Sequence, residues 1–357
     1  MRFFPPGAPL SAFTRGFGGT CFLLGVVLFV GCAGEQAPAR TTFLFDGPIM
    51  GTSYKVKIVR GELADPEREA LANAIRAELE DVNARMSTYI NDSELMLLNA
   101  HETSEPFPLS AGTYEVLEKA RTIYDETGGA FDVTIGPLVG AWGFGVDAED
   151  PEAVDDLDTR IADAVERVGF EKLTLADGAV TKSRPDVFSD LSAIAKGYAV
   201  DRVSEKLEEM GETDFMAEVG GEVRAAGTNA EGNAWRIGIE RPEVVQGALQ
   251  RIVPLANMAM ATSGDYRNYR EVNGKRVAHI MDPRTRRPIE HRLASVSVVD
   301  ETCTLADAYA TALFVLGSEE GYKFATEKDL AAFFLVRDGE GYTELATPAF
   351  ETLGKAQ

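Results

Sequence analysis

The chain contains 357 residues, of which 45% are hydrophobic, and its formal net charge is −22 at pH 7. A chain of this length and composition can bury the core of one large domain or of two merged lobes. Its acidic balance disfavours a nucleic-acid partner, because nucleic-acid binding depends on neutralising phosphates, and it disfavours electrostatic adhesion to anionic lipid.

The N-terminus has the pattern of a secretion signal. Arg2 and Arg15 are the only charged residues before Glu35, and residues 21–30 form an unbroken apolar run that is too short to span a bilayer. Removal of residues 1–31 would leave 33 basic and 57 acidic residues, a net charge of −24. Any contact with a membrane is therefore expected to come from a lipid anchor.

The apolar run ends in the string Leu28-Phe29-Val30-Gly31-Cys32. This string resembles a bacterial lipobox, in which a signal peptidase cuts before a cysteine that is then diacylated, although Phe29 departs from the usual leucine. The alternative is an ordinary secretory signal with cleavage nearby. We predict a lipoprotein signal peptide over residues 1–31, lipidation of Cys32, a tether over residues 32–41, one folded domain over residues 42–357, and a periplasm-facing location.

The domain is predicted to begin with a β-hairpin and a long helix. Residues 42–45 and 54–59 have the composition of strands, with a tight turn at residues 50–52 between them. Asp65 and Pro66 predict the N-cap and the first residue of a helix. The apolar stripe of that helix consists of Leu71, Ile75, Leu79, Val82 and Met86.

The next stretch predicts more helices, and the second half is rich in strands. We expect helices capped by Ser93 and Ser110, an acidic surface insertion over residues 147–158, a hairpin over residues 173–182 and a helix over residues 193–210. Later strands are predicted over residues 235–240, 258–262, 277–281, 294–299 and 330–336. The lack of βαβ alternation indicates an α+β fold with mixed or antiparallel sheets, several long helices and two merged lobes.

A polar pair lies on a predicted helix near the C-terminal end. The helix is expected to begin near Thr304, continue through Leu316 and end at Gly317. Asp307 and Thr311 are four residues apart and therefore share one face, where they offer the oxygen ligands that Mg²⁺ prefers. The alternative is that Thr304 caps the helix and Asp307 is its capping partner.

A second candidate site is the string Asp190-Leu-Ser-Ala-Ile-Ala-Lys196-Gly197, at a predicted strand-to-helix junction. A helix N-terminus attracts phosphate, and Lys196 adds a positive charge. The alternative is that Asp190 or Ser192 caps the helix and Lys196 is a solvated surface lysine. A glycine inside a helix, as predicted for Gly197, costs about 1 kcal/mol of stability relative to alanine. The close approach of a ligand or of packed backbone would explain why this position holds a glycine.

Three further segments have polar residues in settings suited to contact with a ligand. Asp132, among the glycines and aromatics of residues 131–145, is placed to hydrogen-bond a planar ring, or alternatively its own backbone. Residues 261–266 form a small polar turn after a strand, suited to the edge of a nucleotide. His279 follows an apolar strand and is either structural or a base or phosphate contact; no role is assigned to His101 or His291.

Seven motifs in this order resemble those of the ApbE-type FAD:protein FMN transferases, a family of flavin transferases. They extend over most of the domain, and together they are far more specific than any one of them. The motifs are residues 50–52 (MGT), 86–89 (MSTY), 131–137 (FDVTIGP), 190–197 (DLSAIAKG), 261–266 (ATSGDY), 279–283 (HIMDP) and 306–313 (ADAYATAL).

The resemblance implies a Mg²⁺-dependent reaction in an FAD cleft between the lobes. FAD is the substrate, AMP leaves, and FMN is esterified through its phosphate to a threonine or serine of a target protein, here expected to be a membrane-associated redox subunit. Asp307, Thr311 and the Ala193 carbonyl match the family's metal ligands, and Asp307 or His279 is the base. The positions that match FAD contacts are Met50, Met86, Thr88, Tyr89, Asp132, Lys196, Ala261, Thr262, Ser263, Gly264, Asp265 and His279.

Two other functions remain open at this stage. The same site could pass FMN to water, which would make the protein an FAD pyrophosphatase. A lipoprotein that binds flavin without chemistry is the second alternative, against which the paired Asp307 and Thr311 argue.

Overall fold

In the computed structural model, the residues described are 39–144, 157–242, 249–264, 269–272, 275–278 and 280–353. The predicted signal peptide, Cys32, Asp265 and His279 lie outside them, as does most of the acidic insertion, whose last two residues begin a helix. The chain from Ala39 onward forms one compact unit. Within the described residues, no helix is both long enough and apolar enough to cross a membrane.

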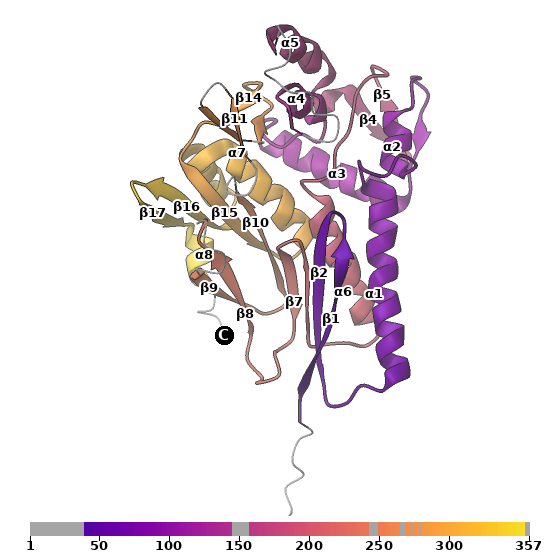
Figure 1. The fold of residues 1–357 in the computed structure, drawn as a ribbon, viewed down its shortest axis with the longest axis vertical. Coiled ribbons are helices and arrows are strands. Elements are labelled where there is room, and N and C mark those ends of the chain that lie inside the picture. The colour runs from indigo at the N-terminus through magenta and orange to yellow at the C-terminus, as the bar shows by residue number, and fades with distance from the viewer. Residues whose placement is uncertain are drawn as a thin grey trace, which may run out of the picture. The chain divides into compact units, whose positions relative to one another are not determined.

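An eight-stranded sheet forms the centre of this unit (Figure 1). Its strands, in spatial order, are β1 (Thr41–Ile49), β2 (Thr52–Arg60), β6 (Phe215–Val219), β7 (Glu222–Ala226), β10 (Met258–Gly264), β15 (Leu293–Asp300), β16 (Ala331–Asp338) and β17 (Gly341–Ala346). Each strand is antiparallel to its neighbour. The α+β class predicted from the sequence is confirmed.

Smaller sheets and helices surround the central sheet. The remaining strands are β3 (Phe107–Pro108), β4 (Leu173–Ala176), β5 (Ala179–Lys182), β8 (Trp235–Glu240), β9 (Leu249–Leu255), β11 (Tyr269–Val272), β12 (Lys275–Ala278), β13 (Met281–Asp282) and β14 (Arg287–Pro288). The helices are α1 (Asp65–Met86), α2 (Glu94–Asn99), α3 (Ala111–Glu126), α4 (Gly136–Ala141), α5 (Leu157–Arg167), α6 (Ala195–Glu209), α7 (Cys303–Glu327) and α8 (Pro348–Thr352), with a 3₁₀ turn at Phe170–Lys172.

Both faces of the central sheet are buried. Along β16, Ala332 and Phe334 point into a core shared with α1, α3, α6 and α7, whereas Phe333 and Leu335 point into a second core shared with β8, β9 and α8. This alternation follows from the pleat of a strand, and burial on both faces explains why the strand is apolar from Ala331 to Val336. α6 packs against both α1 and α7, and α7 crosses the sheet over β10 and β15 (Figure 1).

The first long helix follows its predicted stripe but not its predicted start. All five stripe residues of α1 are buried. The N-cap is Ala64 rather than Asp65, because Glu67 reaches back and its Oε2 accepts a hydrogen bond from the Ala64 N–H at 3.1 Å. Ser93 and Ser110 cap α2 and α3 as predicted, each accepting a backbone N–H. Residues 277–281 are not one strand, since β12 and β13 belong to separate sheets.

The predicted end of a helix at Gly317 is confirmed, but a second helical segment, which was not predicted, follows it directly. α7 runs from Cys303 to Glu327 and is kinked at Gly317, where φ is 78° and ψ is −176°. His291 compensates for the interrupted helix, because its Nε2 donates to the Phe314 carbonyl at 2.7 Å. Its ring lies 2.8 Å from the position that a Cβ of Gly317 would occupy. His291, to which the sequence assigned no role, therefore supports the kink.

Candidate active site

Two tight turns meet the first turn of α6. Met50 and Gly51, with φ values of 48° and 69°, form the predicted turn between β1 and β2. Gly220, with φ of 63°, belongs to the turn between β6 and β7, and its N–H donates to the Ser53 carbonyl at 3.0 Å. A Cβ on Gly220 would lie 3.3 Å from Cδ of Lys196, so the MGT turn and the lysine are brought close together.

The ammonium of Lys196 lies between two buried carboxylates. Its Nζ is 2.9 Å from Oε1 of Glu222 and 3.5 Å from both carboxylate oxygens of Asp307. Glu222 is only 4% exposed and Asp307 only 3%. The interpretation of Lys196 as a solvated surface lysine is therefore wrong, because the lysine is one member of a buried charge cluster.

The two carboxylates determine the protonation of this cluster. Burial alone would lower the pKa of Lys196, but the charges of Asp307 and Glu222 outweigh burial and raise it. Burial raises the pKa of Asp307 and that of Glu222, and repulsion from Asp307 adds to the effect at Glu222. The ammonium opposes both shifts, so Lys196 stays charged and holds the two carboxylates together.

Gly197 is required where α6 meets α7. Its N–H donates to Oδ2 of Asp307 at 3.0 Å. A Cβ at this position would lie 2.3 Å from the carbonyl oxygen of Cys303, a distance that no real contact allows. Close backbone packing, one of the two explanations that the sequence suggested for this glycine, is the one observed.

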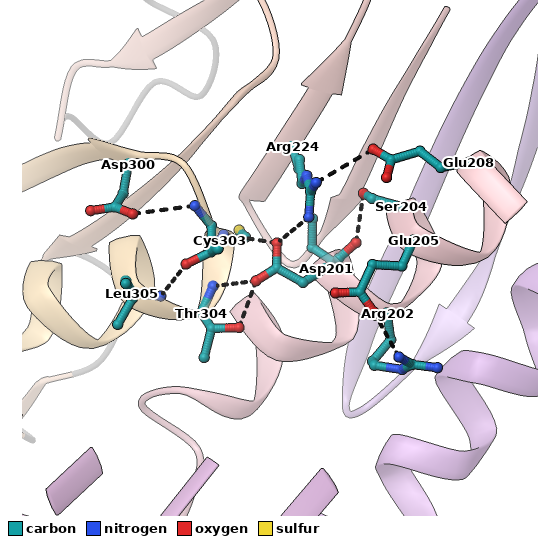
Figure 2. A network of polar contacts seen from close by, with 12 residues as sticks. Asp201, Arg202, Ser204, Glu205, Glu208, Arg224, Asp300, Cys303, Thr304 and Leu305 are labelled. Carbon is teal, nitrogen blue, oxygen red and sulfur yellow. Dashed lines mark hydrogen bonds and ion pairs between the residues drawn. The ribbon is translucent and has the colours of Figure 1, made fainter. Parts of the chain in front are cut away.

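Asp201 attaches the beginning of α7 to α6 (Figure 2). Its carboxylate accepts from the N–H groups of Cys303 and Thr304, at 2.9 and 2.8 Å, and from the Thr304 hydroxyl at 2.6 Å. Arg224, on β7, pairs with the same carboxylate at 3.1 Å. Because an aspartate on one helix satisfies free N–H groups of another, the start of α7 is fixed on α6.

The capping alternative for Thr304 and Asp307 is accordingly wrong. The N-cap of α7 is Thr302, whose hydroxyl accepts from the Leu305 N–H. Thr304 points at Asp201 instead, and Asp307, one turn further on, points at Gly197 and Lys196. The Asp307 carboxylate thus belongs to the charge cluster rather than to the helix end.

Thr311 and the segment predicted as a nucleotide turn also meet. The hydroxyl of Ser263 lies 3.1 Å from that of Thr311. Residues 261–264 belong to β10 rather than to a turn, and alternate residues of a strand face opposite sides. Ala261 is completely buried on the α7 side, and Thr262 bonds to Ser297 at 2.7 Å. Of the described residues of this motif, Ser263 is the one whose side chain contacts Thr311.

The segment before α6 is ordered by short polar contacts. Oδ1 of Asp190 accepts from the N–H and the hydroxyl of Ser192, at 2.9 and 2.5 Å. The Asp190 N–H donates to the Val133 carbonyl at 2.7 Å, which joins the DLSAIAKG and FDVTIGP motifs. The helix itself begins at Ala195, two residues later than predicted, so Ala193 lies in the turn before it.

Asp132 is buried beside a cavity of about 340 Å³. Its Oδ1 accepts from the N–H and the hydroxyl of Thr134, at 2.8 and 2.7 Å, so the interpretation that Asp132 bonds its own backbone segment is confirmed. Arg284 and Arg286 line the same cavity. The cavity thus combines two carboxyl groups, those of Asp132 and Glu171, with two cationic side chains, at a volume suited to a small ligand or part of one.

Replacement of Asp132 by asparagine is expected to raise the free energy of unfolding at pH 8 by on the order of 2 kcal/mol. Burial raises the pKa of this carboxyl from 3.8 to about 6 in the folded protein. Between pH 3.8 and about pH 6, the carboxyl group is more protonated in the folded state than in the unfolded state. Asp132 therefore lowers the free energy of unfolding increasingly as the pH rises through this range. The full loss is reached above about pH 6. Asparagine keeps an oxygen for Thr134. Denaturant unfolding should show the gain at pH 8 and none near pH 4, and equal gains at both would contradict the reasoning.

The MSTY motif presents one of its three predicted contact residues to solvent. Met86 and Thr88 are buried, and Met86 packs in the core that the central sheet shares with α1, α3, α6 and α7. Tyr89 is 74% exposed, and its N–H donates to the Ser87 hydroxyl at 3.1 Å. A large aromatic ring held outward in this way is available to a planar ligand, whereas the buried side chains support the loop that carries it.

The charge cluster is suited to a cation. Two buried carboxylates face one ammonium, which leaves one negative charge in excess, and Oε2 of Glu222 is buried with no hydrogen-bond partner among the described residues. Thr311 adds a hydroxyl one turn from Asp307. No group of three or more His, Cys, Asp or Glu side chains forms a metal site in the described ranges. The predicted site, a carboxylate, a hydroxyl and a carbonyl, does not need one.

Two residues of the site, one in the charge cluster and one at the start of α7, were not found by sequence reasoning. Glu222 and Asp201 come from a strand and a helix far from α7 in the chain, and each looks like an ordinary charged residue in an acidic protein. The tandem glycines before Glu222, and the position of Asp201 next to the buried Val200, were the available signals.

Known proteins similar to this chain agree on one family. A sequence model of the ApbE family matches residues 50–334. The FAD:protein FMN transferase of Vibrio cholerae is 41% identical over 329 residues, which cover 92% of this chain and 96% of that protein. That of Haemophilus influenzae is 40% identical over 337 residues, which cover 93% and 96%.

Solved structures show the same fold. The flavin transferase ApbE from Vibrio cholerae has a TM-score of 0.80 and 40% identity, and the match covers 88% of this chain and 99% of that one. The ApbE protein of Thermotoga maritima has a TM-score of 0.74 and 28% identity, with the same coverage. Sequence, fold and the ordered motifs agree, and the chain belongs to the ApbE family.

Proposed function

We propose that this protein transfers FMN from FAD to a threonine or serine hydroxyl of a target protein, with Mg²⁺ as cofactor and AMP as the leaving group. The observation that carries the proposal is the buried Asp307, one turn from Thr311 and next to Lys196. The names of the relatives, which share about two fifths of its residues over almost the whole chain, support it.

The residues of the cluster suit the transfer of a phosphoryl group, which needs positioned charge more than covalent help. Asp307, Thr311 and the Ala193 carbonyl would hold Mg²⁺, which when bound neutralises charge on the phosphate oxygens. The Gly197 N–H fixes Oδ2 of Asp307, and the Lys196 ammonium is placed to contact a phosphate oxygen.

The reaction forms a bond between the acceptor oxygen and the phosphorus of the FMN moiety and breaks the bond from that phosphorus to the oxygen that leaves with AMP. The hydroxyl proton must leave the acceptor. We assign its removal to Asp307 or to His279, the two bases that the resemblance to the flavin transferases implies. The cavity beside Asp132 and the exposed ring of Tyr89 are the proposed contacts of the FAD rings.

Mass spectrometry of a target domain incubated with the protein, FAD and Mg²⁺ tests this proposal. The domain should be the periplasmic part of a membrane redox subunit with a candidate acceptor threonine. A mass gain of one FMN group, lost when that threonine is replaced by valine, is expected. No gain with release of FMN and AMP would instead indicate a pyrophosphatase, and FAD binding without AMP release would indicate a flavin carrier.

We also propose that Cys32 carries a lipid that anchors the protein on the periplasmic side of a bacterial membrane. The lipobox-like string and the acidic domain, which has little electrostatic affinity for lipid, support this. Labelling of growing cells with a radioactive fatty acid checks it, since the wild-type protein should be labelled and Cys32→Ser should not. Equal labelling of the two would refute it.

A further inference from the structure

Glu222 is a buried acid in the charge cluster for which neither the motifs nor the sequence supplied a role. It begins β7, directly after the Gly220-Gly221 turn, and is 4% exposed. Its Oε1 is 2.9 Å from Nζ of Lys196, and its Oε2 has no hydrogen-bond partner in the described part of the chain. A carboxylate removed from water with one oxygen unsatisfied is costly, so packing alone does not explain it.

The strand places Glu222 on the helix side of the sheet for electrostatic reasons. Val223 and Ala225 point into the core beneath the opposite face, so Glu222 and Arg224 point toward α6 and α7. Arg224 pairs with Asp201, which fixes the start of α7, and Glu222 pairs with Lys196. Both side chains thus act on the junction that carries Asp307.

The distances show which carboxylate binds the ammonium more closely. Nζ of Lys196 is 2.9 Å from Glu222 but 3.5 Å from each oxygen of Asp307. Because Coulomb attraction rises steeply at short range in a buried site, removal of the Glu222 charge would move the ammonium onto Asp307. Asp307 would then be neutralised by a neighbouring lysine, and its affinity for a cation would fall.

We propose that Glu222 is a positioning residue that draws the Lys196 ammonium toward itself, so that the ion pair between Lys196 and Asp307 stays long and Asp307 remains available to a divalent cation. The identity of that cation rests on the proposed function. The arrangement separates two tasks, since Lys196 remains available to a phosphate while Asp307 remains available to the metal.

Calorimetric titration of Mg²⁺ into flavin-free protein tests this inference. We expect Glu222→Gln, which keeps the shape of the side chain, to weaken Mg²⁺ binding about tenfold. The double variant Glu222→Gln/Lys196→Met should bind Mg²⁺ at least as tightly as the wild type, because no ammonium is left to neutralise Asp307. Glu218→Gln removes the same charge from the opposite face of the neighbouring strand and should bind Mg²⁺ like the wild type.

The Mg²⁺ affinities of these variants distinguish a positioning role of Glu222 from a purely structural one. A general loss of structure would weaken the double variant further, whereas positioning predicts its recovery, and thermal unfolding verifies that each variant is folded. Unchanged binding by Glu222→Gln, a double variant as weak as the single one, or no Mg²⁺ binding by the wild type would each overturn the inference. The FMN-transfer assay tests the proposed function separately. If the Mg²⁺ affinities of the variants follow the expected pattern but no FMN is transferred, only the proposed function is overturned. If FMN is transferred but the affinities do not follow the pattern, only the role of Glu222 is overturned.

Discussion

Replacement of Asp307 by asparagine is expected to lower the rate of FMN transfer roughly a thousandfold, which corresponds to about 4 kcal/mol. The Asp307 carboxylate supplies the negative charge of the proposed Mg²⁺-binding site. Asparagine has the same shape as aspartate but carries no charge. An amide oxygen at this position can still accept from the Gly197 N–H, which now bonds to Oδ2 at 3.0 Å. The variant should therefore fold, and FAD binding through other contacts should persist.

Single-turnover transfer to the target domain, together with FAD binding followed by flavin fluorescence, measures the two effects separately. Glu327→Gln is a suitable control, because it removes one negative charge from the exposed end of the same helix. It should leave transfer unchanged. Wild-type rates in Asp307→Asn would rule out this residue as the source of the site's charge.

Replacement of Gly197 by alanine is expected to cost about 3 kcal/mol of folding free energy and to slow transfer about a hundredfold. The added methyl group would lie 2.3 Å from the Cys303 carbonyl oxygen and 2.8 Å from Cβ of Asp307. Both neighbours are held by backbone, so α6 and α7 must separate. This movement displaces Asp307 from Lys196 and breaks its bond to the Gly197 N–H.

Urea unfolding gives the loss of stability, and the transfer assay gives the loss of rate. Gly140→Ala is the matched control, since Gly140 also lies in a helix but no atom is within 4 Å of its added Cβ. Its stability should change by less than about 1 kcal/mol. If Gly197→Ala were as stable and as active as this control, the close approach of the two helices would not be needed.

Features that depend on neighbouring residues could be predicted from the sequence. The apolar stripe of α1, the caps at Ser93 and Ser110 and the strand pattern of β16 express local periodicity and local hydrogen bonding. The pairing of Asp307 with Thr311 on one face follows from helical geometry in the same way. The ordered motifs then indicated which of many polar residues belong together.

Features that depend on contacts distant in sequence could not be predicted. Thr302 caps α7 because Asp201, on another helix, occupies the donors of Thr304. The helical segment that follows Gly317 was not predicted, and His291, from another segment of the chain, satisfies the Phe314 carbonyl next to the kink. Glu222 becomes part of the site only because the sheet order places β7 beside the start of α6, which no periodicity reveals.

The attachment of the start of α7 to Asp201 has a consequence for folding. The N–H of Cys303 and the carboxylate of Asp201 are 102 positions apart in the chain, so the contact forms only after a long loop closes. Asp307 acquires its neighbours Lys196 and Gly197 through that same closure. The charge cluster of Lys196, Glu222 and Asp307 therefore depends on contacts between distant parts of the chain, and an unfolded chain contains its residues without their arrangement.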